Sequence, residues 1–384
     1  MSKKYLLLVD DEENILRALS RELEDWIAER HIELLFANNG KKALEILKEK
    51  GKETVLIVSD LRMPEMKGSE LLLRVKEEYP FIVSILLTGY SEIEEIIKSI
   101  KAGIFSYILK PWDSDYLLSE ITKAYEYAEL QRSHHRILLQ MQEELRWAGE
   151  MQRNLLRPNL PASEKVEFRV SYKPLVYCGG DYYDVITLSP DRYLILLGDV
   201  AGHGIRAAII TGILKAVIYP EYVRTSLTRT ISPAHFLSWL NDRMNFELRR
   251  TTGILITFFA GIMDLQSNIL QYANAGQCHP ILVRHKTVYE LPVAGSAIGY
   301  AQNVNFNEQI TQLQEGDILS FFTDGLVEYK KDNDHIITIS AKTIFEGVEY
   351  TQEYHKNILN RALEISGTKN FTDDVTILTA RIQG

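Results

Sequence analysis

Acidic side chains, one hydroxyl and one lysine follow short apolar runs in the first third of the sequence. The residues that end these runs are Asp10, Asp11, Asp60, Thr88 and Lys110. Three carboxylates that share one pocket repel each other unless a divalent cation and a fixed ammonium group offset their charge. If the fold brings these side chains together, they predict a Mg²⁺ site with a lysine beside it.

Four later segments each carry an aspartate next to a glycine or threonine. They are GGDYYD at 179–184, GDVAGHG at 198–204, TDG at 323–325 and TDDVT at 372–376. Oxygen ligands suit Mg²⁺ and Mn²⁺, and glycine lets the backbone approach an ion closely. A single Gly-Asp pair is more typical of an ordinary turn, but four segments in order predict a centre for two cations. Two cations about 3.5–4 Å apart activate a bridging water and stabilise in-line displacement at phosphorus.

The elements that must position the first set are short strands alternating with helical periodicity. The strands are expected at residues 5–9, 32–36, 55–58, 83–87 and 106–109. Such alternation is typical of parallel βαβ units, and wholly apolar strands suit a sheet covered by helices on both faces. We therefore expect an α/β doubly wound sheet, whose functional crevice lies beyond the carboxyl ends of its strands.

With these residues at these places, positions 1–125 resemble the receiver domain of two-component response regulators, a flavodoxin-like α/β fold. The resemblance implies that Asp60 is the phosphate acceptor. It also implies that Asp11, Asp60 and the backbone carbonyl of Arg62 hold Mg²⁺, and that Asp10 acts through a bound water. The alternative for VDDE at 9–12 alone is a strand followed by an acidic helix N-terminus.

The same resemblance assigns a two-state switch to the remaining positions. Lys110 would pair with the phosphoryl group, and Thr88 would bind a phosphoryl oxygen through its hydroxyl. Tyr107 would then swing inward, although an aromatic residue near a strand end is also typical of simple packing. A sensor histidine kinase is the expected partner that phosphorylates Asp60.

Residues 113–157 predict one long helix, because they contain no proline and, apart from Gly149, no glycine. Apolar residues recur in it at spacings of three and four, namely Leu138, Met141, Leu145 and Ala148, with Leu155 a heptad beyond. This spacing favours a coiled-coil-like linker over 126–157 that pairs two chains as a homodimer. The alternative is an amphipathic helix that lies on its own second domain.

From residue 158 the pattern changes to alternating strands with turn signals, from VEFRVSYKP to DDVTILTARI. Helices are expected at 204–218, 233–248 and 354–365. These features predict an α+β domain over 158–384, in which two antiparallel sheets are flanked by helices.

The four aspartate segments resemble the bacterial branch of the PPM-type metal-dependent protein phosphatases, which includes sporulation and general-stress regulators. The resemblance covers residues 145–382. It implies two Mn²⁺ or Mg²⁺ ions, with Asp199 as the bridging ligand, and a metal-activated water as nucleophile. The implied ligands are Asp181, Asp199, the backbone carbonyl of Val200, Asp324 and Asp373.

The resemblance also suggests the substrate, which is phosphoserine or phosphothreonine on an anti-anti-sigma factor with a STAS domain. It leaves the roles of Asp184 and Asp374 open, since either could cap a helix, support a ligand or bind a third metal. We expect His203 to be a structural hydrogen-bonding residue, because carboxylate sites for hard cations seldom recruit imidazole.

Composition excludes several other classes of protein. A formal net charge of −9 weighs against an electrostatic grip on nucleic acid. No segment approaches the ~20 apolar residues of a membrane helix, and Cys178 and Cys278 form no CxxC pattern. A cytoplasmic enzyme is expected. The alternative is a non-catalytic adaptor that binds a regulatory protein under receiver control, and the intact set of aspartates favours the enzyme.

Overall fold

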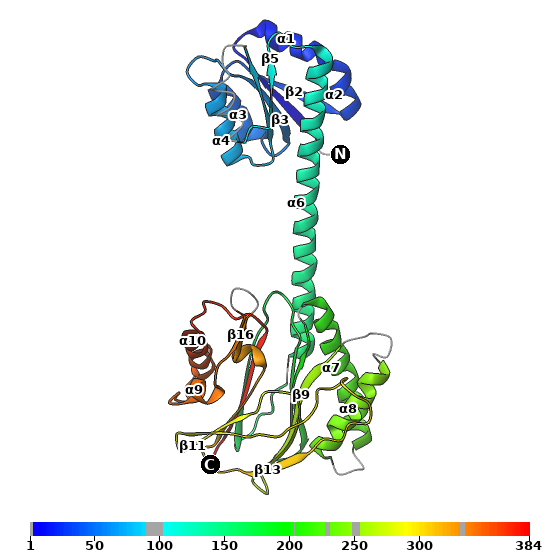
Figure 1. Cartoon of the computed structure of the whole chain (residues 1–384), viewed down its shortest axis with the longest axis vertical. Helices are drawn as coiled ribbons and strands as arrows, with labels where there is room; N and C mark the ends of the chain where they lie inside the picture. Colours follow the sequence, from blue (N-terminus) through cyan, green and yellow to red (C-terminus); the bar gives the residue numbers. More distant parts are fainter. Residues whose placement is uncertain are drawn as a thin grey trace. The chain divides into compact units, whose positions relative to one another are not determined.

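The structure is a computed structural model that describes residues 3–89, 103–157, 159–202, 204–226, 231–247, 254–330 and 335–384. His203, which is expected to be a structural hydrogen-bonding residue, lies outside these ranges. The chain divides into two compact units, Met1–Met141 and Gln142–Gly384, drawn in Figure 1. Within the described ranges, no helix combines the length and apolar character that crossing a bilayer requires.

The first unit contains a five-stranded sheet with the order β2-β1-β3-β4-β5. Its strands are β1 (Lys4–Val9), β2 (Ile32–Ala37), β3 (Thr54–Asp60), β4 (Val83–Thr88) and β5 (Ser106–Leu109). All neighbouring strands are parallel. This strand order is that of flavodoxin-like folds, so the predicted doubly wound sheet is confirmed, with strand ends within two residues of those expected.

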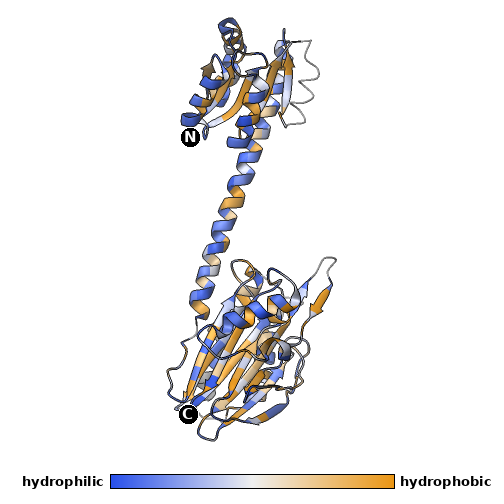
Figure 2. Cartoon of the chain, turned by 90° about the vertical axis from the view of Figure 1, so that its left-hand side faces the viewer, coloured by the Kyte–Doolittle hydropathy of each residue, from blue (hydrophilic) through white to orange (hydrophobic). Residues whose placement is uncertain are grey.

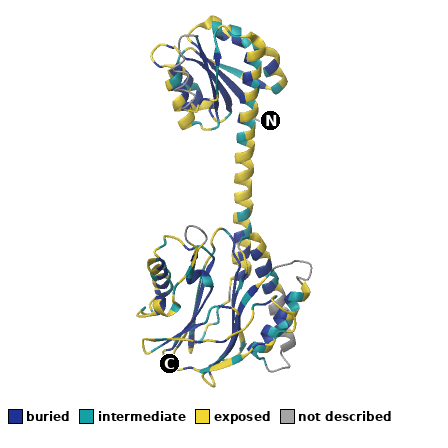
Figure 3. Cartoon of the chain, in the orientation of Figure 1, coloured by how far each residue is buried: buried dark blue, intermediate teal, exposed yellow. Residues whose placement is uncertain are grey.

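Helices cover both faces of this sheet. They are α1 (Glu13–Glu22), α2 (Glu24–Arg30), α3 (Gly40–Lys50), α4 (Gly68–Glu78) and the start of α6 (Ser114–Leu156). One apolar cluster joins the sheet to α1, α2 and α6, and a second joins it to α3 and α4. Burial on both faces explains why the strands β1, β3 and β4 are mostly apolar (Figure 3).

Helix α6 is 43 residues long, and the predicted long helix is confirmed. Asp113 begins it by accepting a hydrogen bond from the backbone N–H of Tyr116 at 3.0 Å. Its early apolar residues Leu117 and Ile121 are buried in the first unit, whereas every residue from 133 to 144 is exposed. Its last turns, up to the buried Leu156, belong to the second unit.

The second unit contains two five-stranded sheets. The first has the order β13-β10-β9-β8-β7 and the second β12-β11-β14-β17-β6, and neighbouring strands in both are antiparallel. The strands of the first are β7 (Asp181–Ser189), β8 (Arg192–Val200), β9 (Ile256–Asp264), β10 (Ile269–Ala275) and β13 (Glu308–Gln312). Those of the second are β6 (Val166–Lys173), β11 (Ile281–Arg284), β12 (Thr287–Glu290), β14 (Ile318–Phe322) and β17 (Val375–Ile382).

An apolar cluster lies between the two sheets, and helices cover their outer faces. The first sheet packs on α7 (Ile205–Ser226) and α8 (Pro233–Glu247), and the second on α9 (Ala341–Phe345) and α10 (Tyr354–Ser366). A short hairpin of β15 (Glu328–Lys330) and β16 (Ile336–Thr338) stands apart from both sheets. Figure 2 shows apolar residues concentrated along the strands.

The predicted architecture of two antiparallel sheets flanked by helices is confirmed. All three predicted helices are present, but α7 runs on to Ser226, past its expected end at residue 218. Helix α8 ends at Glu247, and Leu248, its expected last residue, is outside the part of the chain that the structure describes.

Candidate phosphoacceptor and metal sites

Asp10, Asp60 and Lys110 meet at the carboxyl edge of the parallel sheet, where β1, β3 and β5 end. The Lys110 ammonium donates to Asp10 Oδ2 at 2.7 Å and also to Asp60 Oδ1. Asp60 is 7% exposed and Asp10 only 1%. The sheet therefore assembles a buried ion-pair network from residues that are 50 and 100 positions apart in the sequence.

Burial and the lysine act in opposite directions on this network. Burial raises the pKa of Asp60, and the Lys110 ammonium only partly offsets this effect. Burial also disfavours the charged form of Lys110, but its hydrogen bonds to Asp10 and Asp60 outweigh that effect and raise the pKa of Lys110. The lysine therefore keeps its proton and stays a fixed cation beside Asp60.

The other residues of the predicted receiver site lie around this network. Asp11 is exposed at the end of β1. Arg62 donates its backbone N–H to Asp60 Oδ2 at 2.7 Å. Thr88 is buried at the end of β4, next to Gly89, while Tyr107 on β5 is half-buried against the cluster under α3 and α4. All of them lie on or beside strands β1, β3, β4 and β5.

In the second unit, Asp181 and Asp199 lie opposite each other on the paired strands β7 and β8. Asp324 begins a short 3-10 turn directly after β14, and Asp373 precedes β17, the strand that pairs with β14. Hydroxyls from the second sheet reach Asp181, because Thr323 and Thr376 both donate to its Oδ2, at 2.9 and 2.6 Å. These two hydrogen bonds join the aspartate-bearing ends of the two sheets.

Asp181 is fully buried, and its other oxygen, Oδ1, has no hydrogen-bond partner among the residues that the structure describes. An unpaired buried carboxylate oxygen is costly, so it calls for a ligand. Gly180, next to Asp181 in the chain, has no side chain and leaves space for such a ligand. A Cβ atom on Gly180 would lie 2.6 Å from the Val200 carbonyl oxygen and 3.1 Å from Asp199 Oδ1, so both predicted oxygen ligands converge on this glycine. These oxygens fit a hard divalent cation.

Electrostatics support the same conclusion. Burial, and then the neighbouring charges of Asp181, Asp324 and Asp373, raise the pKa of Asp199 to about 10. Burial and the charge of Asp373 raise that of Asp324 to about 6. The four carboxylates therefore repel each other strongly, and a bound cation would reverse that effect.

No three His, Cys, Asp or Glu side chains in the described ranges already form a closed metal-ligand cluster. The predicted ligand set also includes the main-chain oxygen of Val200, which is not a side-chain group. How these donors would coordinate a cation therefore stays a prediction.

Asp374 and Asp184, whose roles the sequence left open, are both engaged by protein groups. Asp374 accepts the backbone N–H groups of Leu175 and Gly180, each at 2.7 Å. Asp184 is paired with Lys215 of α7 and accepts the N–H of Val185 at 3.1 Å. The first fixes the loop that leads into Asp181, and the second ties β7 to α7.

Sequence reasoning missed Gln152, Thr323 and Thr376. Gln152 on α6 donates from Nε2 to the Gly179 carbonyl oxygen at 2.6 Å and accepts the Gly179 N–H at 3.1 Å. The two threonines stand inside the TDG and TDDVT segments, so their position beside the ligands was visible in the sequence. Gln152 carried no such signal, because its partner is 27 residues away.

Comparison with known proteins agrees with this architecture. A model of the response regulator receiver domain matches residues 6–122, and one described as Stage II sporulation protein E (SpoIIE) matches residues 189–383. Hydrogenase transcriptional regulatory protein HoxA of Cupriavidus necator is 36% identical over 137 residues, which are 35% of this chain and 27% of that protein. The chain thus matches only about a quarter of HoxA.

Two further matches cover larger shares of the chain. Phosphoserine phosphatase RsbU of Bacillus subtilis (strain 168) is 26% identical over 247 residues, which are 63% of this chain and 71% of that protein. The SiaA-PP2C domain of Pseudomonas aeruginosa has the same fold, with a TM-score of 0.54 and 23% identity over 64% of this chain and 99% of that domain. Because the SpoIIE model covers just over half of the 384 residues, the chain belongs to the SpoIIE family, as a response-regulator receiver domain followed by a PPM-type metal-dependent phosphatase domain.

Proposed function

We propose that phosphorylation of Asp60 controls a two-metal phosphatase that acts on phosphoserine or phosphothreonine of a partner protein. The observation that carries the proposal is the environment of the Asp181 carboxylate. Asp181 is fully buried, two threonine hydroxyls hold one of its oxygens, and the other, beside Gly180, has no partner in the described part of the chain. A buried carboxylate with one free oxygen suits a cation ligand better than any role in packing.

The residues that would hold the two Mn²⁺ or Mg²⁺ ions are Asp181, Asp199, Asp324, Asp373 and the carbonyl of Val200. When bound, the ions supply a hydroxide at neutral pH and stabilise the charge that develops on the phosphoryl oxygens. The protein keeps the ligands in place. Thr323 and Thr376 orient Asp181, and Asp374 fixes the loop before it.

In the receiver, Asp60 would accept a phosphoryl group from a sensor histidine kinase. Asp11, Asp60 and the carbonyl of Arg62 would hold Mg²⁺, with Asp10 acting through a bound water. The Lys110 ammonium already lies against Asp60, where it can neutralise phosphoryl charge. Thr88 and Tyr107 would then rearrange as the switch.

The similarity to RsbU, which is named a phosphoserine phosphatase, supports phosphoserine as the group that is hydrolysed. We propose a phosphorylated STAS-domain anti-anti-sigma factor in the cytoplasm, and no nucleic-acid partner. Both cysteines are free thiols, as a reducing compartment would allow.

We further propose that α6 pairs two copies of the chain. Leu138, Met141 and Leu155 are 45%, 54% and 49% exposed, and large apolar side chains on an exposed helix favour association. Leu145 and Ala148 are half-buried. Light scattering tests this pairing. The Leu138→Asp variant should be monomeric. If it stays dimeric, the apolar residues of α6 do not pair two chains, and the alternative of a helix that lies on its own second domain is favoured.

The alternative function is a non-catalytic adaptor. Incubation of the full chain with Mn²⁺ and a phosphoserine STAS protein, with and without a small-molecule phosphodonor, separates the two. Release of inorganic phosphate supports the enzyme. Stable binding of the STAS protein without phosphate release would instead support the adaptor.

A further inference from the structure

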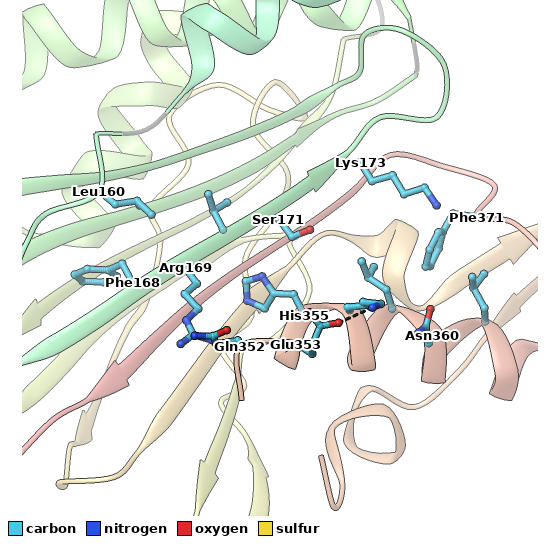
Figure 4. A pocket seen from close by; sticks show the side chains of 14 residues that line it. Leu160, Phe168, Arg169, Ser171, Lys173, Gln352, Glu353, His355, Asn360 and Phe371 are labelled. Atoms are coloured by element: carbon cyan, nitrogen blue, oxygen red, sulfur yellow. Dashed lines mark hydrogen bonds and ion pairs between the residues drawn. The ribbon is translucent and has the colours of Figure 1, made fainter. Parts of the chain in front are cut away.

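A groove of about 590 Å³ runs between β6 and α10 in the second unit. Side chains from both elements line it, as Figure 4 shows. Lys173 and Phe371 lie at one end, while Leu160 and Phe168 lie at the other. None of the predicted metal ligands lines this groove, so it is a separate surface feature.

Strand β6 forms the edge of its sheet. The order β12-β11-β14-β17-β6 leaves β17 as its strand partner in the described part of the chain. Every second N–H and C=O of an edge strand points away from the sheet and can pair with an added extended chain. With eight residues, β6 offers an edge of roughly 26 Å at about 3.3 Å per residue.

The groove is cationic although the whole chain carries a formal charge of −9. Arg169, Lys173 and Lys356 line it, against one carboxylate, Glu353. Burial, and then the charge of Arg169, lower the pKa of His355 to about 4, so this imidazole is neutral at pH 7. With Glu167, which pairs with Arg169, counted beside Glu353, the local charge is +1, which complements an acidic segment.

Lys173 is the cation best placed to meet such a segment. It is exposed, and its ammonium lies 5.1 Å from the centre of the Phe371 ring. By contrast, Arg169 is already paired with Glu167 at 2.6 Å and Lys356 with Glu353 at 2.6 Å. Among the described residues, no ion pair engages Lys173.

The Lys173 end of the groove adjoins the proposed metal centre. Lys173 lies opposite Val375 in the β6–β17 register, and Val375 is two residues after Asp373. Phe371 precedes Asp373 by two residues. A polypeptide that delivers a phosphorylated residue to the four aspartates therefore passes close to this end.

We propose that the groove binds an acidic, extended segment of the phosphoprotein substrate, close in sequence to its phosphorylated residue. The segment pairs with the free edge of β6 and places a carboxylate against Lys173. This inference rests on the proposed phosphatase function and adds the chemistry by which the substrate is recognised.

The test uses the full chain and three phosphoserine peptides of equal length, whose flanking residues are acidic, neutral or basic. With Mn²⁺, kcat/KM for the acidic peptide should exceed that for the neutral one roughly threefold to tenfold, which is the size expected for one or two exposed charge pairs. Lys173→Glu should abolish or invert this preference. Lys286→Glu is the matched control, because it reverses an exposed lysine in the β11–β12 turn at the opposite edge of the same sheet.

Binding measured without metal gives a second readout. Fluorescence anisotropy of a labelled, unphosphorylated acidic peptide should show binding to the unaltered chain and weaker binding to Lys173→Glu. Equal kcat/KM for all three peptides would overturn the groove proposal. So would a change in oligomeric mass on Lys173→Glu, which would assign the groove to a second copy.

Failure of the proposed function looks different. In that case the unaltered chain would not hydrolyse p-nitrophenyl phosphate in the presence of Mn²⁺. Hydrolysis of that small substrate without any preference among the peptides would leave the phosphatase standing and contradict only the groove.

Discussion

Gln152 holds both backbone polar groups of Gly179, two residues before Asp181. Its Nε2 donates to the Gly179 carbonyl oxygen at 2.6 Å, and its Oε1 accepts the Gly179 N–H at 3.1 Å. One turn earlier, Gly149 lets α6 approach the loop, because a Cβ there would clash with the Tyr177 carbonyl oxygen. The end of α6 is thus tied directly to the loop that leads into Asp181, a proposed metal ligand.

Gln152→Leu should therefore impair the metal centre more than the fold. The variant leaves two buried backbone groups unpaired, at a cost of about 1–3 kcal/mol, and frees the loop before Asp181. We expect a higher Mn²⁺ requirement for p-nitrophenyl phosphate hydrolysis. Gln152→Glu keeps the acceptor for the Gly179 N–H but lacks the donor, so its defect should be intermediate. An unchanged Mn²⁺ titration in both variants would show that this clamp is not needed.

Asp199→Asn should abolish hydrolysis and leave the metal-free protein at least as stable as before. Burial and four neighbouring carboxylates raise the pKa of Asp199 to about 10, so without metal this carboxyl must take up a proton on folding near pH 7, and the amide of asparagine removes that cost. Thermal unfolding in EDTA and hydrolysis with Mn²⁺ measure the two effects. Normal turnover by the Asp199→Asn variant would contradict the two-metal proposal.

Thr376→Val should weaken metal binding, because it removes the 2.6 Å hydrogen bond that orients Asp181. Loss of a residue that orients a ligand typically costs 10- to 100-fold in metal affinity. Thr379→Val on the same strand is the matched control, since the Thr379 hydroxyl contacts His355 rather than the aspartates. Calorimetric titration with Mn²⁺ should separate the two variants, and equal affinities would contradict the assigned role.

His355 should make the second unit less stable as the pH falls. Its pKa is about 4 in the folded chain, against about 6.5 in an unfolded one. Its contribution is therefore complete above pH 6.5 and is lost between pH 6.5 and 4, because only the unfolded state binds the proton there. The full effect is roughly 3 kcal/mol.

The comparison variant for this prediction is His355→Gln, which can still hydrogen-bond the Thr379 hydroxyl. Urea unfolding at pH 7 and pH 4.5 should show a smaller loss of stability for the variant than for the unaltered chain. Equal losses would mean that other groups account for the acid sensitivity.

Much of the fold was visible in the sequence, because apolar runs and turn signals are local. The strands that deliver Asp10, Asp60 and Lys110 could be located to within two residues. The hydrogen bonds that orient the second site were less visible, since they join distant positions. Asp181 and Thr376, for example, are 195 residues apart.

The linker illustrates a second limit. The absence of proline and the single glycine predicted one continuous helix, and α6 is continuous. Periodicity could not say which apolar positions are covered. Leu145 and Ala148 are half-buried whereas Leu138 and Met141 are exposed, because the helix meets the second unit only after residue 141.

The most direct test of receiver control compares the unaltered chain with Asp60→Asn. Both are incubated with Mn²⁺ and a phosphoserine STAS protein, with and without acetyl phosphate, and phosphate release is followed. The unaltered chain should change its rate roughly fivefold or more on addition of the phosphodonor, as allosteric coupling typically allows. Asp60→Asn should keep a measurable basal rate that does not respond. Equal responses in both proteins, or none in either, would contradict control of the phosphatase through Asp60.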